Sequence, residues 1–193
     1  MISLLAEKAV DAFFDHSMIT KDDRDLYVYG FFILFSKIIY FIWTVLLGAL
    51  FGVVVECIVF YVLFSFLREF AGGIHASKEQ SCMLWTSVSI MLSVVAIWAG
   101  CKCSHTSAFT CLFIVGSVII VILCPQDSEA KRLSKAERKK YKQKSITCIL
   151  LIIFGGGLSL LTDQIGLYIS CSVCIALECI LLLAGKTIIH RSS

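Results

Sequence analysis

Long apolar runs dominate this sequence and are separated by short polar segments. Hydrophobic residues make up 59% of the 193 residues, well above their share in a soluble globular domain. A helix of about 20 apolar residues can cross the hydrocarbon core of a bilayer. The runs lie at 26–47, 51–67, 83–100, 108–124, 146–161 and 167–184. The sequence therefore predicts one membrane-embedded domain over 1–193, an all-α polytopic protein with six transmembrane helices.

The first segment, 1–25, has a different pattern. Apolar side chains recur there at helical spacing: Ile2, Leu5, Ala6, Ala9, Val10, Phe13 and Phe14. This pattern predicts an amphipathic helix, which either lies along the membrane surface or packs on the protein's own cytoplasmic face. Because the segment has no continuous apolar core, we expect no cleavable signal peptide.

The distribution of cations predicts the orientation in the membrane. Basic residues gather near both termini and in the loops 68–82 and 125–145, and the second loop alone carries eight Lys/Arg. The opposite side keeps only Lys102. By the positive-inside rule, an even number of spans puts both termini and both loops in the cytoplasm. We therefore expect a multi-pass cell-membrane protein whose polar loops face the cytoplasm.

The loop 68–82 is a polar, glycine-hinged connection that carries a histidine and a cysteine. Gly72 and Gly73 are expected to end the preceding helix. The motif Ser77–Gln80 fits a capping box, so Cys82 falls in the first turns of the next helix. Unpaired N–H groups favour a thiolate there. His75 precedes the cap, where the chain can fold back towards Cys82.

A Cys/His pair of this kind supplies a nucleophile and its general base. The alternative is that Cys82 is a packing residue, because the chain has ten cysteines and most lie inside apolar runs. Cys171-x-x-Cys174 is interpreted in the same way, as packing within a span. No disulfide framework, metal site, cofactor or nucleic-acid partner is expected.

Charged residues inside the predicted spans support a rival interpretation. Lys37, Glu56 and Glu178 lie at membrane depth, and they could line the pathway of a transporter or a peptide-binding scaffold. Lys37 and Glu56 fall at similar depth, so either they pair, or Lys37 lines a polar cavity or snorkels. A second rival is a cysteine acyltransferase that uses the same Cys/His pair on another substrate.

The basic loop 125–145 allows three interpretations. It could bind anionic lipid, hold an acidic segment of a peptide substrate, or act only as a topology signal. The candidate substrate-binding cations are Lys135, Arg138, Lys139, Lys140 and Lys142.

The pattern Arg68…Gly72-Gly73-x-His75…Cys82 resembles the signature of the AgrB family, the accessory gene regulator B proteins of Gram-positive bacteria. The basic loop from Pro125 onward resembles that family's central loop, although the family pattern carries a second proline that this chain lacks.

The resemblance implies a membrane-embedded cysteine endopeptidase. Such an enzyme cuts a short signal pro-peptide, which is cyclised to a thiolactone or lactone autoinducer for quorum sensing. The family's catalytic residues fall on His75 and Cys82. Arg68, Gly72 and Gly73 are supporting residues, with Arg68 or nearby backbone N–H groups as candidate oxyanion donors. The resemblance also implies an acidic pro-peptide tail and a homodimer.

Overall fold

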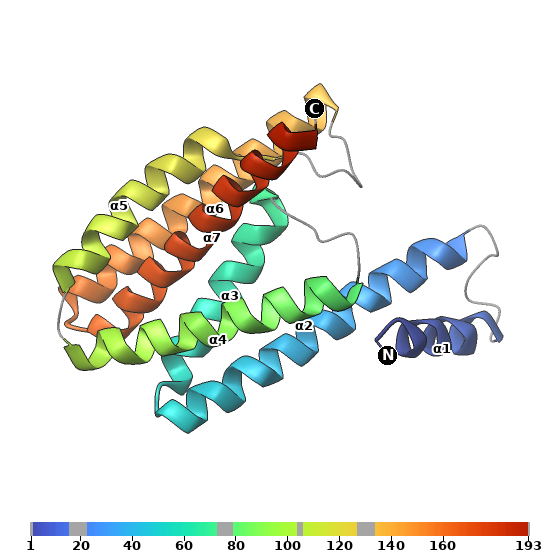
Figure 1. Ribbon diagram of the computed structural model, residues 1–193, viewed down its shortest axis with the longest axis horizontal. Helices are drawn as coiled ribbons and strands as arrows, with labels where there is room; N and C mark the ends of the chain where they lie inside the picture. The colour runs from blue at the N-terminus through green and yellow to red at the C-terminus, as the bar shows by residue number, and fades with distance from the viewer. Residues whose placement is uncertain (1, 16–22, 73–78, 104–105, 127–133, 193) are drawn as a thin grey trace. The chain divides into compact units, whose positions relative to one another are not determined.

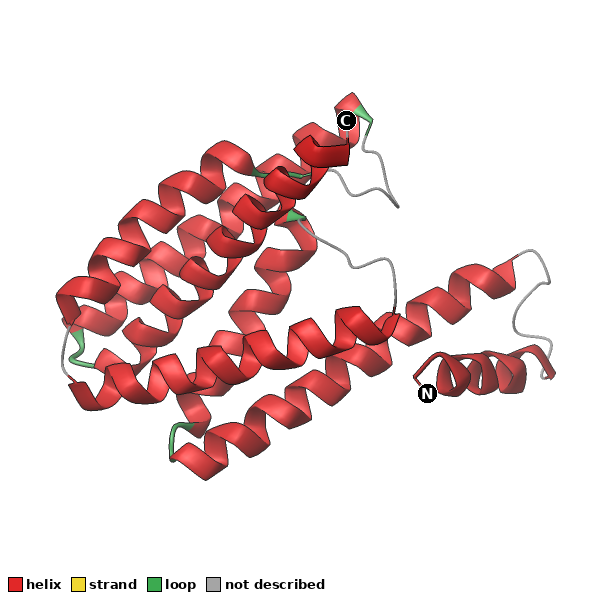
Figure 2. Cartoon of the chain, in the orientation of Figure 1, coloured by secondary structure: helices red, strands yellow, loops and turns green. Residues whose placement is uncertain are grey.

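The computed structural model describes residues 2–15, 23–72, 79–103, 106–126 and 134–192. Within these residues the chain is helical, with short connections and no strand (Figure 2). The helices are α1 (Ile2–Asp15), α2 (Arg24–Phe51), α3 (Val54–Ala71), α4 (Glu79–Cys103), α5 (Thr106–Leu123), α6 (Lys135–Leu161) and α7 (Ile165–Ser192). The chain forms two compact units, 1–43 and 44–193, which are described separately.

The prediction of an all-α polytopic membrane protein is confirmed. Five helices in the described part of the chain are long and apolar enough to cross a bilayer, namely α2, α4, α5, α6 and α7. The remaining predicted span corresponds to α3, which differs because it carries Glu56, Arg68 and Glu69 within its 18 residues. Of these three, Arg68 forms an ion pair with the buried Glu178 of α7.

The first unit contains α1 and most of α2. Ile2, Ala6 and Val10 form a fully buried stripe along α1, whereas Leu5 is half-exposed. Phe13 stacks on Phe31 with 5.6 Å between ring centroids. The amphipathic helix is therefore present, and its buried stripe favours packing on the protein over lying free along the membrane surface.

The second unit is built around α7, the red helix of Figure 1, which contacts α3, α4, α5 and α6. Its apolar stretch is 61% buried, against 11–22% in the other candidate spans. Two glycines allow close approach. A Cβ added to Gly116 of α5 would lie 2.7 Å from Ile175, and one added to Gly100 of α4 would lie 2.9 Å from Ile169. Small residues of this kind let membrane helices pack closely.

The basic loop is shorter than predicted, because α6 begins at Lys135 and most of the segment 125–145 is helical. A capping box starts the helix. The Ser134 hydroxyl accepts a bond from the N–H of Glu137 at 3.3 Å, and the Glu137 carboxylate accepts one from the N–H of Ser134 at 2.9 Å. The predicted loop is therefore helical over 135–145, because the capping box starts α6 well before its apolar run.

Candidate active site

Cys82 lies in the first turns of α4, as the sequence predicted, and its side chain is half-buried. Its carbonyl accepts a hydrogen bond from the Thr86 hydroxyl at 2.8 Å. The Cys82 thiol therefore sits near the N-terminal end of a long helix. Gly73, His75 and Ser77 lie outside the described residues, so the approach of His75 to Cys82 and the capping box at Ser77 stay predictions.

The connection that leads to His75 leaves α3 at a glycine in an unusual conformation. Gly72 has φ 78° and ψ −150°, a region that is open almost only to glycine. Its N–H donates to the carbonyl of Arg68 at 3.3 Å, and its own carbonyl accepts from Arg68 Nη1 at 2.6 Å. Gly72 thus ends α3 as predicted, and Arg68 holds its carbonyl in place.

The same guanidinium forms an ion pair with Glu178 of α7. The distance from Arg68 Nη1 to Glu178 Oε1 is 3.6 Å, and the Glu178 side chain is fully buried. Neither carboxylate oxygen has a hydrogen-bond partner among the described residues. A buried charge without a counter-charge is strongly destabilising, so this pair ties the end of α3 to the interior of α7.

Gln126 anchors the start of the connection between α5 and α6 at the end of α3. Its N–H donates to the carbonyl of Ala71 at 3.0 Å, and its side-chain amide donates to the carbonyl of Leu182 at 2.7 Å. Gly72 and Gln126 form an isolated parallel bridge. The segment that leads to the predicted catalytic loop and the segment that leads to the basic region therefore start side by side.

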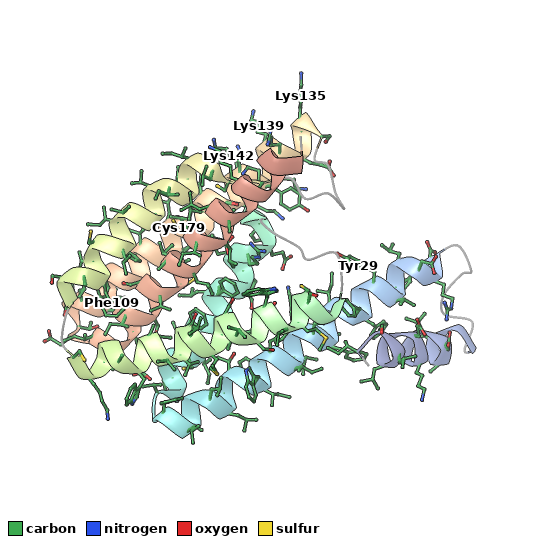
Figure 3. The ribbon with its side chains drawn as sticks, in the orientation of Figure 1. Tyr29, Phe109, Lys135, Lys139, Lys142 and Cys179 are labelled. Carbon is green, nitrogen blue, oxygen red and sulfur yellow. The ribbon has the colours of Figure 1, made fainter. Side chains whose placement is uncertain are left out.

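The predicted substrate-binding cations lie at the start of α6. Lys135, Arg138, Lys139, Lys140 and Lys142 are all exposed. Figure 3 shows Lys135, Lys139 and Lys142 along the first turns of the helix.

The first turns of α6 pack on the end of α3. The ring of Phe70 lies 6.4 Å from that of Tyr141, and Lys144 Nζ lies 4.8 Å from the Phe70 centroid. Such a cation–π contact helps to fix the two helices. The exposed cations at the start of α6, called the basic surface below, therefore lie next to the end of α3. The chain continues from that end of α3 towards His75.

Among the described cysteines, several are packing residues as predicted. Cys57, Cys124, Cys171, Cys174 and Cys179 are buried and free. Cys124 lies directly after the end of α5 and is buried. Burial makes these five thiols poor candidates for a nucleophile, whereas Cys82 is only half-buried. No group of residues in the described ranges could hold a metal ion.

The partnership of Arg68 with Glu178 was missed by sequence reasoning, which placed Glu178 in a possible transport pathway. A signal was available, because Glu178 is the one acidic residue in the run 167–184 and Arg68 ends another run of the same orientation. The predicted Lys37–Glu56 pair would join the two separately described units and stays a prediction. Glu56 lies against the start of α7, where a Cβ added to Gly166 would be 2.6 Å from its carboxylate.

Residues 6–182 match the family Accessory gene regulator B. This chain belongs to the AgrB family. It is 26% identical over 144 residues to an AgrB-like protein of Clostridium perfringens (strain SM101 / Type A), covering 68% of this chain and 63% of that protein. It is 27% identical over 120 residues to Protein FsrB of Enterococcus faecalis (strain ATCC 47077 / OG1RF), covering 62% of this chain and 49% of that protein.

The AgrB-family chain thus aligns with less than two thirds of the length of these relatives. No solved structure matches it. Family membership confirms the resemblance drawn from the loop 68–82, and the match covers both the Cys82 region and the basic start of α6.

Proposed function

We propose that this AgrB-family protein is a membrane cysteine endopeptidase that matures a quorum-sensing signal pro-peptide. The observation that carries the proposal is Cys82, half-buried in the first turns of α4 and seven residues after His75. The geometry at Arg68, Gly72 and Gln126 supports it, because these residues fix the start of the connection that carries His75.

In the first step, His75 takes the proton of the Cys82 thiol, and the sulfur attacks the carbonyl carbon of the scissile peptide bond. Collapse of the tetrahedral intermediate breaks the C–N bond, and the imidazolium returns its proton to the leaving amine. The N-terminal part of the pro-peptide is then held as a thioester on Cys82.

In the second step, a thiol or hydroxyl of the peptide itself attacks the thioester carbonyl. The new bond closes a thiolactone or lactone ring, the Cys82 sulfur leaves, and the proton passes through His75 to restore the free thiol. Intramolecular attack has a high effective concentration, and a membrane-held site keeps water away. Arg68 already donates to Gly72, so backbone N–H groups at the start of α4 are the better oxyanion donors.

The proposal includes the substrate, the orientation in the membrane and the oligomeric state. The substrate is a short pro-peptide with an acidic tail, held by the cations at the start of α6, and the site and both termini face the cytoplasm in a homodimer. The transporter alternative loses support because Glu178 is buried against Arg68 and is not available to line a pathway.

The test is co-expression of the protein with a candidate pro-peptide, followed by mass spectrometry of the products. Cys82→Ala should abolish both the cyclic product and the thioester, while membrane insertion persists. Cys111→Ala is the matched control, because Cys111 is an exposed free cysteine of α5, and it should leave product formation unchanged. Full processing by the Cys82→Ala protein would refute the proposal.

A further inference from the structure

Glu178 is the buried end of a chain of contacts that reaches the peptide backbone before His75. The carboxylate pairs with Arg68 at 3.6 Å, and Arg68 donates to the carbonyl of Gly72 at 2.6 Å. The Arg68 side chain is 20% exposed, whereas Glu178 is 0% exposed. The guanidinium could therefore turn outward if the carboxylate no longer attracted it, and Gly72 would lose its donor.

A movement of the Gly72 carbonyl would reach His75 through a short stretch of backbone. His75 follows Gly72 by three residues, and a chain extends by at most about 3.5 Å per residue. The backbone connection to His75 is therefore at most about 10 Å long, and it starts at a carbonyl that Arg68 holds. A displacement of about 1 Å between reacting groups can lower a rate by about 100-fold.

We propose that Glu178 is a positioning residue for the Cys82–His75 pair and acts through Arg68 on the carbonyl of Gly72. The inference rests on the proposed function. A purely structural role would require only that the two charges neutralise each other inside the protein. A positioning role also requires that the residue at 68 be a donor to Gly72, and this difference can be tested.

The experiment measures how fast iodoacetamide alkylates Cys82 at pH 7 in the full-length protein in native membranes, by mass spectrometry of the Cys82 peptide. We expect Glu178→Gln to slow alkylation about tenfold, because His75 no longer takes the thiol proton efficiently. Glu178→Asp keeps the charge and should restore most of the rate. Ser172→Ala is the control, since Ser172 is a buried α7 residue that bonds only to the Tyr168 carbonyl among the contacts described, and its rate should be unchanged.

The exchange Arg68→Glu/Glu178→Arg separates the two roles, and it decides the matter if Glu178→Gln does not accumulate in the membrane. The pair remains neutral, so expression and thermal stability should recover. Glutamate cannot donate to the Gly72 carbonyl, so alkylation of Cys82 should stay slow. A wild-type alkylation rate in Glu178→Gln or in the exchanged protein would overturn the inference.

His75→Gln distinguishes failure of this inference from failure of the proposed function. If His75→Gln is alkylated as fast as the wild type, the Cys82–His75 pair itself is refuted. If His75→Gln is slow and Glu178→Gln is normal, only the role of Glu178 is refuted.

Discussion

Gly72 and Gln126 face each other in a parallel bridge, which is extended by the hydrogen bond from the Gln126 N–H to the Ala71 carbonyl at 3.0 Å. The contact is close enough that a Cβ on Gly72 would collide with the Gln126 carbonyl oxygen. Two connections far apart in sequence therefore begin at one point, where α7 holds both through Glu178 and Leu182.

Gly72→Ala should be strongly destabilising. The backbone angles of Gly72 cost a residue with a side chain about 1–3 kcal/mol, and the collision with Gln126 adds to this. We expect a lower melting temperature in detergent and loss of pro-peptide processing. Gly155→Ala is the matched control, because a Cβ on Gly155 meets nothing within 4 Å, and it should gain up to about 1 kcal/mol of helix stability. Equal melting temperatures for the two variants would contradict the role of Gly72.

His75→Gln should keep the fold and lower the processing rate by about 100-fold or more, the usual contribution of a general acid–base group. Single-turnover cleavage measured with and without the substitution checks this. His16, His105 and His190 should be replaceable. An essential His105 together with a dispensable His75 would move the site to the other side of the membrane and refute the assignment.

Much of the fold follows from the sequence, because apolar runs and helix ends are local features. The helices α2–α7 correspond to the six predicted runs, and Cys82 falls in the first turns of α4 as the glycines and the cap motif indicated. The start of α6 differs from the prediction, because Ser134 and Glu137 form a capping box that begins the helix before its apolar run. A strongly basic stretch can be helical, because its charged side chains face water along the helix surface.

The contacts of the candidate site were harder to predict, because they join helices that are distant in sequence. The sequence groups Glu178 with Lys37 and Glu56 as charges at membrane depth, whereas the partner of Glu178 is Arg68. That pairing depends on α7 packing against α3, which the apolar pattern of either helix does not specify. Gln126 likewise acquires its role only from the meeting of two connections.

Ser134→Ala should fray the first turn of α6. Loss of an N-cap side chain costs a helix about 0.5–2 kcal/mol, and this turn carries Lys135 and part of the basic surface. We expect faster amide hydrogen exchange at Glu137 and a moderately higher KM for the pro-peptide. Thr147→Ala is a suitable control, since its hydroxyl donates only to the Gln143 carbonyl among the bonds described in mid-helix. Unchanged exchange at Glu137 would show that the cap does not stabilise the turn.

The basic surface of α6 should act on substrate binding rather than on chemistry. Lys135, Lys139 and Lys142 follow one another at helical spacing and are all exposed. An exposed ion pair contributes only about 0–1 kcal/mol, so a single Lys→Gln change should have little effect. Changing all three together should raise KM about tenfold while kcat changes little, because binding is lost and the reacting groups are untouched.

The effect of the triple change on KM should depend on ionic strength. The difference in KM should shrink as ionic strength rises, because screening weakens the wild-type contact, and it should also shrink when the acidic tail of the pro-peptide is neutralised. Lys102→Gln is the control, since this cation lies at the end of α4 with its Nζ 4.8 Å from the Trp98 ring centroid. If the triple variant cuts the pro-peptide with a normal KM at low salt, the cations serve lipid contact or topology instead of substrate binding.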